Sequence, residues 1–202
     1  MTDIKAYLSL FIQANGLQSA GLLLPGITLE PHRVKVLMIS EAPLANPEDG
    51  FYSRAPQPEA MKTTLALFQS AGIPVGGIDD ILSLGVYITT AVKSPKSGYA
   101  VDPRALAAHL PLLEAELDLF PDLQVIMLMG DVAKKAFNQI AKKRTGKNCI
   151  PSGSTYKIRD SEFYFGNVRV FPSYILTGGN LLIEKSKCEM IAEDLRNMMK
   201  LL

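Results

Sequence analysis

Polar and aromatic side chains follow directly after four apolar runs of the chain. Each run has the composition of a buried β-strand, and each is followed by glycine or proline together with carboxylates, hydroxyls, aromatic rings or lysines. These groups could position water, stack on a planar ring or bind an anion. We therefore expect chemistry in four segments: Ser40–Ser53 (SEAPLANPEDGFYS), Thr89–Pro95 (TTAVKSP), Met129–Phe137 (MGDVAKKAF) and Phe171–Asn180 (FPSYILTGGN).

A run of basic residues begins inside the third segment. Six positive charges fall within fourteen residues without an intervening acid: Lys134, Lys135, Lys142, Lys143, Arg144 and Lys147. Such a run is an electrostatic footprint for a polyanion, although a solvated, lysine-rich helix face has the same composition. The net charge of +1 argues against a protein that is basic throughout, so contact with nucleic acid would be local.

Histidine and cysteine residues are too few and too scattered for a metal site or a catalytic triad. His32 precedes a strand and His109 falls within a helical pattern, so neither has a partner nearby in sequence. Cys149 and Cys188 cannot supply a four-thiolate zinc or iron–sulfur site. We expect no metal and no other cofactor.

The four apolar runs predict the strands of a mainly parallel sheet, with an antiparallel excursion possible only at 155–165. Helical spacing is expected at the N-terminus, after Pro58, after Asp102, after Gly130 and at the C-terminus, with Pro111 kinking or dividing the third helix. The alternation predicts an α/β three-layer sandwich, with helices on both faces of a four-stranded sheet. Ligands of such sheets bind at the carboxyl ends of the strands. The strands expected are 34–40, 86–90, 124–129 and 168–173.

Length and composition are those of one globular unit. A chain of 202 residues, 48% hydrophobic and 20% charged, fits a single domain spanning 1–202. The apolar runs are far shorter than the ~20 residues that a membrane span requires, and the N-terminus lacks the pattern of a signal peptide. We expect a cytoplasmic protein without a membrane partner, and the oligomeric state stays open.

In order and spacing, the four segments resemble the motifs of the uracil-DNA glycosylase superfamily. The resemblance runs from about Val34 to the C-terminal helix and is nearest to branches whose first motif reads GEAPG, where this chain has Ser40 and Leu44 in place of the glycines. It implies a domain that flips a base out of DNA and hydrolyses the bond between base and sugar. The branch with this motif usually holds an iron–sulfur cluster on four cysteines, so the two cysteines here imply a cluster-free relative.

The resemblance assigns roles to the first loop. Glu41 occupies the carboxylate position of the motif, and Glu48 and Asp49 follow in the same loop, so these acids could position a water or offset positive charge on the sugar. Alternatively, Glu41 caps a neighbouring helix and the other two are solvated loop charges. Phe51 and Tyr52 lie where the family stacks an aromatic ring on the flipped base. We assign Phe51 to the pocket, with Tyr52 as the alternate, and expect one of them to anchor the loop.

Two departures from the family fall on its polar contacts to the base. Thr90 replaces the asparagine that reads the base edge, and a single hydroxyl cannot make the bidentate amide contact with uracil. Phe171 replaces the histidine of the fourth motif and cannot donate a hydrogen bond to a departing base anion. We still expect Thr90 and Phe171 to join Glu41 and Phe51 in one base pocket.

Contacts to DNA are implied for the later segments. Ser173 matches the phosphate-binding serine of the fourth motif, and Ile175 and Leu176 match its wedge, although both could instead be buried under the last helix. Lys93 and Lys96 after the second strand, with Arg54 in the first loop, could line the phosphate path. The expected DNA-binding residues are therefore Lys93, Ser173, Ile175, Leu176 and, from the basic run, Lys142, Lys143 and Arg144.

Three functions follow from these observations. The first is a DNA-repair N-glycosylase that hydrolyses the base–sugar bond of a flipped, damaged base, with single- or double-stranded DNA as partner. The second is a catalytically degenerate nucleic-acid or nucleobase-binding protein of the same fold. The third is an enzyme that binds a different small substrate in the same crevice. Thr90 and Phe171 separate them, because an asparagine and a histidine there would have favoured uracil excision.

Overall fold

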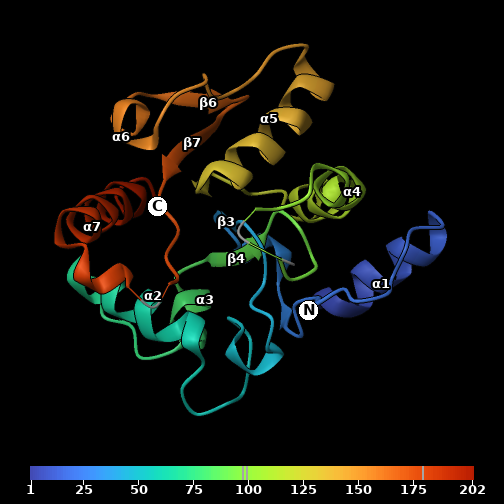
Figure 1. Cartoon of the computed structure of the whole chain (residues 1–202), viewed down its shortest axis with the longest axis horizontal. Helices are drawn as coiled ribbons and strands as arrows, with labels where there is room; N and C mark the ends of the chain where they lie inside the picture. Colours follow the sequence, from blue (N-terminus) through green and yellow to red (C-terminus); the bar gives the residue numbers. More distant parts are fainter. Residues whose placement is uncertain (97, 99, 179) are drawn as a thin grey trace.

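A central sheet of five strands organises the chain, in the order β4-β3-β5-β7-β6 (Figure 1). The computed structural model describes residues 1–96, 98, 100–178 and 180–202. β3, β4, β5 and β7 are parallel, and β6 pairs antiparallel with β7, so the four parallel strands end at the same edge of the sheet. The strands are β3 (Val36–Ser40), β4 (Val86–Thr90), β5 (Val125–Met129), β6 (Phe163–Phe165) and β7 (Val168–Ser173).

Helices cover both faces of this sheet (Figure 1). On one face α4 (Pro103–Leu119) and α5 (Asp131–Thr145) pack on the strands, and α1 (Ile4–Ala14) packs against α4. The other face is covered by α2 (Glu59–Ser70), α3 (Ile78–Ser83) and α7 (Lys185–Met199). Smaller elements complete the chain: β1 (Thr2–Asp3), β2 (Thr28–Leu29), η1 (Pro31–Arg33), η2 (Pro47–Asp49), α6 (Thr155–Ile158) and η3 (Leu181–Ile183).

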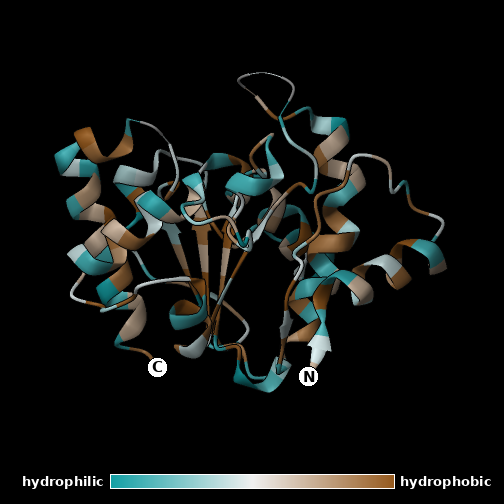
Figure 2. Ribbon diagram, turned by 90° about the horizontal axis from the view of Figure 1, so that it is seen from below, coloured by the Kyte–Doolittle hydropathy of each residue, from teal (hydrophilic) through white to brown (hydrophobic). Residues whose placement is uncertain are grey.

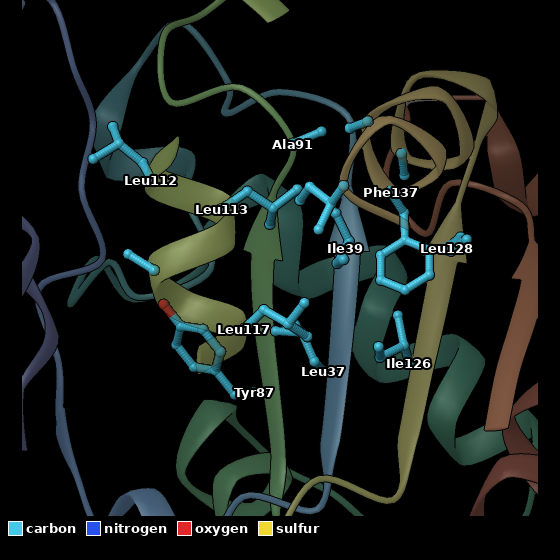
Figure 3. Close-up of a cluster of buried hydrophobic side chains, with 14 of the residues drawn as sticks. Leu37, Ile39, Tyr87, Ala91, Leu112, Leu113, Leu117, Ile126, Leu128 and Phe137 are labelled. Atoms are coloured by element: carbon cyan, nitrogen blue, oxygen red, sulfur yellow. The ribbon is translucent and has the colours of Figure 1, made fainter. Parts of the chain in front are cut away.

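The core forms around strands that point apolar side chains to both faces of the sheet. Every residue of β3, β4 and β5 is buried, as expected for parallel strands with helices on both faces. Figure 3 shows Leu113 and Leu117 of α4 and Phe137 of α5 above Ile39 and Leu128 of the sheet. Figure 2 shows the same contrast along the chain, because the strands are largely apolar while each helix carries hydrophilic residues on part of its surface.

The predicted architecture is confirmed, with two corrections. The sheet has a fifth strand, β6, which lies in the region where an antiparallel excursion was allowed. Pro111 does not divide the third helix, since α4 continues through it and buries Leu112 and Leu113 beyond it. Within the described residues, no helix is both long and apolar enough to cross a bilayer.

Candidate functional site

A crevice runs along the carboxyl ends of the four parallel strands and consists of three adjoining hollows. The inner cavity, of about 280 Å³, lies between residues 22–26, the first loop at 42–44 and 50–53, and the end of β4. The middle cavity, of about 270 Å³, is lined by residues 40–45 together with Lys96 and Ile175. The outer groove, of about 550 Å³, is lined by Glu41, the start of α5, residues 154–156 and, from the chain after β7, Tyr174, Ile175, Thr177, Gly178, Asn180, Leu181, Glu184 and Lys187. Thr177 lines all three, so the hollows adjoin one another.

Glu41 lies where the middle cavity meets the outer groove. It directly follows β3 and is only 9% exposed. Its Oε2 is ion-paired with the ammonium of Lys96, and its Oε1 accepts a 3.4 Å hydrogen bond from the backbone N–H of Val132 in the first turn of α5. Glu41 therefore caps a helix, as the alternative interpretation expected, and also presents a carboxylate to the crevice.

Gly130 leaves the space that this carboxylate occupies. Its φ of +95° is a left-handed conformation, and a Cβ built on it would lie 2.7 Å from Glu41 Oε1 and 2.8 Å from Ile175 Cγ1. Backbone and side chains are thus packed so closely that only glycine fits between β5 and α5. Glu41 can therefore occupy its observed position only because residue 130 has no side chain.

We predict that Gly130→Ala lowers the free energy of unfolding by about 1–3 kcal/mol, because the added methyl group is strained and displaces Glu41 or Ile175. Urea unfolding measures this loss. Gly72→Ala is the matched control, since Gly72 also has a positive φ but nothing lies within 4 Å of a Cβ there. Equal losses for the two variants would contradict the close packing around Glu41.

Phe51 and Tyr52 both line the inner cavity, in different roles. The Tyr52 hydroxyl donates to the carbonyl of Ile88 at 2.8 Å and accepts from the N–H of Ile88 at 3.0 Å. Its ring stacks on Tyr87 with 5.8 Å between centroids, and burial raises the pKa of Tyr52. Tyr52 therefore anchors the first loop to the edge strand β4. Phe51 is half-buried and is the aromatic residue left to contact a ligand.

Thr89 and Thr90 form the β4 wall of the inner cavity and sit above a buried ion pair. Lys93 and Glu116 are both fully buried and ion-paired, and Lys93 Nζ also donates to Thr89 Oγ1 at 2.7 Å and to the Thr90 carbonyl at 2.8 Å. Glu116 Oε1 accepts from Tyr87 and Thr89 at 2.8 Å each. Burial lowers the pKa of Lys93, and the charge of Glu116 opposes that shift.

This network corrects the role expected for Lys93. An ammonium with no exposed surface cannot reach a phosphate, so Lys93 does not line a DNA path. Its backbone N–H donates to Nδ1 of His109 at 3.1 Å, and burial together with the charge of Lys93 lowers the pKa of that histidine. Lys93 holds the end of β4 in place.

Glu48 and Asp49 are not brought to the crevice. Glu48 is exposed on η2 and lines none of the three hollows. Asp49 accepts from the side chain of Asn46 at 3.0 Å and from the N–H of Glu59 at 3.4 Å, at the start of α2. Their expected catalytic role is therefore corrected to that of loop and helix-end carboxylates.

The fourth segment is mostly buried, contrary to the expectation of a base pocket and DNA contacts. Phe171 is 6% exposed and packs in the core on the α7 side, where the Arg169 guanidinium lies 4.4 Å from its ring centroid. It lines none of the three hollows, so it does not meet Phe51 or Thr90. Of the two expected wedge residues, Leu176 is fully buried in the same core, whereas Ile175 is half-buried and lies along the crevice.

Ser173 is also withdrawn from solvent. Its hydroxyl donates to Asp194 Oδ2 at 2.6 Å, and the other oxygen of Asp194 accepts from the buried guanidinium of Arg159 at 2.8 Å. Burial raises the pKa of Asp194 to about 6, although the hydrogen bond from Ser173 and the charge of Arg159 both act to lower it. Ser173 thus joins β7, α6 and α7 and does not face a phosphate.

The basic run lies at the wrong end of the molecule for the crevice. α5 starts at the crevice and runs away from it, so Lys142, Lys143 and Arg144 lie about 15–20 Å along the helix from Asp131. Arg144 makes a bidentate pair with Asp118 at 2.8 Å, and Lys143 pairs with Glu114 at 2.7 Å, both on α4. Lys143 and Arg144 thus belong to an ion-paired helix face, and contact of the basic run with DNA stays a prediction.

Comparison with known proteins identifies the family. The sequence model of the uracil DNA glycosylase superfamily matches residues 28–195. The chain belongs to this superfamily. A wild-type UNG crystal structure from Nitratifractor salsuginis is similar at 13% identity, over 94% of this chain and 85% of that chain, with a TM-score of 0.42. The comparison with curated proteins gives no significant match.

Few hydroxyl groups of the inner cavity near β4 are free to contact a ligand. Thr89 and Tyr52 are already committed to internal hydrogen bonds, which leaves Thr90, 8% exposed, as a hydroxyl on the β4 wall of the inner cavity. The described residues also contain no group of three or more histidine, cysteine or acidic side chains that could hold a metal ion.

Several residues of the site were not singled out from the sequence. Gly130 and Thr177 give no signal beyond their place after a strand, and Lys96 was considered only for a phosphate path. Glu116 could have been found, because it falls beside Leu113 and Leu117 on the apolar stripe of a helix, where a charge requires a buried partner.

Proposed function

We propose that the chain is a DNA N-glycosylase that hydrolyses the base–sugar bond of a base flipped out of its strand. The observation that carries this proposal is the position of Glu41, a nearly buried carboxylate beside a cavity lined by an aromatic ring. The inner cavity, of about 280 Å³, is near the lower limit of small-ligand sites and suits one planar base.

The proposed chemistry divides between the two sides of the crevice. Phe51 stacks on the flipped base in the inner cavity, and the hydroxyl of Thr90 contacts the base edge. Glu41, in the adjoining cavity, orients a water or offsets the positive charge that develops on the sugar as the bond breaks. Lys96 and the first turn of α5 orient the Glu41 side chain by direct contact.

The test is strand scission after alkali treatment of oligonucleotides that contain uracil, hypoxanthine, xanthine or a mismatched base. We expect scission at one or more of these bases. We expect uracil to be a poor substrate, because Thr90 offers one hydroxyl where two polar contacts are needed. Fast excision of uracil alone would contradict this account of specificity, and no scission with any base would contradict the enzymatic proposal.

A second candidate function is binding without catalysis. It is supported by Phe171, which is packed in the core and cannot offer the donor that stabilises a departing base anion. A protein of this kind would bind the same oligonucleotides and leave every glycosidic bond intact. Binding measured by fluorescence anisotropy, alongside the scission assay, separates the two functions.

A further inference from the structure

The outer groove continues the crevice beyond Glu41, away from the inner cavity. Glu41 and Ile175 line both the middle cavity and the outer groove, so the groove lies directly beside the part of the crevice where Glu41 is proposed to act on the sugar. Two tyrosines line the groove, Tyr156 on α6 and Tyr174 after β7. Tyr156 is 70% exposed, which is unusual for an aromatic side chain beside a hollow.

The fold anchors the helix that carries Tyr156 through the residues on either side of it, and leaves the ring exposed. α6 buries Thr155 and Ile158, so the side chain of Tyr156 between them points outward. Lys134, itself buried, donates to Thr155 Oγ1 at 3.1 Å, and Arg159 ties the end of α6 to Asp194 at 2.8 Å. These contacts fix the backbone on which Tyr156 stands, so the ring is held at the edge of the groove while its faces stay open to a planar group.

Charges in the outer groove are balanced by local pairs. Each acidic side chain that lines the groove in the described structure has a lysine partner: Glu41 with Lys96, Asp131 with Lys134 at 2.8 Å, and Glu184 with Lys187 at 2.6 Å. Binding here therefore cannot depend mainly on free lysines that neutralise phosphates. The exposed aromatic ring is the feature suited to a base, whose flat face stacks whatever its identity.

We propose that the outer groove is a stacking subsite for an unpaired base of the same nucleic-acid strand, with Tyr156 as its platform. The proposal deepens the proposed function and rests on it. It names single-stranded nucleic acid, or a locally unpaired strand, as the substrate class, since a base within a duplex cannot expose its face.

The test uses fluorescein-labelled oligothymidylates of about 4, 8 and 12 nucleotides, the range that single-strand sites cover. Fluorescence anisotropy measures the affinity of the wild type and of Tyr156→Ala, Tyr156→Phe and Tyr164→Ala. We expect Tyr156→Ala to weaken binding at least about fivefold, with Tyr156→Phe within about twofold of the wild type. Tyr164→Ala is the matched control, because Tyr164 is a 55% exposed tyrosine on β6 that lines none of the three hollows.

Each other outcome has a separate meaning. Wild type that binds no oligothymidylate overturns this subsite, while the proposed function is decided separately by the scission assay with damaged bases. Wild type that binds while Tyr156→Ala binds equally well overturns the subsite alone, and the exposed ring would then serve a protein partner. Equal losses for Tyr156→Ala and Tyr156→Phe would attribute the contact to the hydroxyl and overturn stacking. Equal losses for Tyr156→Ala and Tyr164→Ala would also overturn it.

Discussion

Glu41→Gln should lower the rate of base excision by about two to four decades on the best substrate of the scission assay, the range lost with a general acid or base. Glutamine is neutral, so it can neither activate a water by accepting a proton nor offset positive charge on the sugar. Single-turnover excision rates measure the effect. The amide oxygen of glutamine can still accept from the Val132 N–H, so the cap on α5 is kept.

Two controls make this result specific to the crevice. Glu48→Gln removes a carboxylate from the same loop, but Glu48 is exposed on η2, so its excision rate should stay within about threefold of the wild type, as for surface changes away from a site. Thermal unfolding of Glu41→Gln checks that the fold is intact. A folded Glu41→Gln variant that excises its base at the wild-type rate would remove Glu41 from the mechanism.

The sequence predicted the sheet well because its strands are buried on both faces. Continuous apolar runs such as Val36–Ser40 and Val125–Met129 are typical of central parallel strands, which are covered on both faces. The helices between these runs then form the right-handed connections from one strand to the next. The extra strand β6 was harder to predict, since Phe163–Phe165 is three residues long and only partly buried. Its pairing depends on the free edge of β7, which the sequence does not display.

The site was predicted only as far as the ends of the strands. Glu41 lies one residue past β3 and lines the crevice, as its position indicates. Phe171 and Ser173 belong to β7 itself, and their side chains are fixed by the core and by Asp194. A motif in the sequence identifies which strand end is involved, but a shift of one or two residues along the strand decides whether a side chain reaches the ligand.

Charge was the least predictable property, because its partners lie far away in the sequence. Arg144 is neutralised by Glu114 and Asp118, which are 26 or more residues earlier in the chain. The basic run contains no acid in the sequence, yet in the fold three of its residues, Lys134, Lys143 and Arg144, are paired with carboxylates. For the same reason the burial of Lys93 could not be predicted, because its partner Glu116 belongs to the next helix.

The buried pair gives the second large prediction, this time for stability. Lys93→Met should lower the free energy of unfolding by about 3–5 kcal/mol, because it leaves the carboxylate of Glu116 buried without a counter-ion. It also removes the donor to Thr89 and to the Thr90 carbonyl, so the β4 wall of the inner cavity loses its support. Urea unfolding monitored by circular dichroism measures the loss.

Two further variants separate this effect from simple loss of packing. Lys62→Met breaks an exposed pair with Glu59 on α2 and should change the stability by less than about 1 kcal/mol, as surface pairs do. The double variant Lys93→Met with Glu116→Gln should be more stable than Lys93→Met alone, because no unpaired charge remains buried while the amide still accepts from Tyr87 or Thr89. A double variant less stable than Lys93→Met would show that the cost comes from the lost lysine side chain. In that case Glu116 would not be the reason that Lys93 lies under the inner cavity.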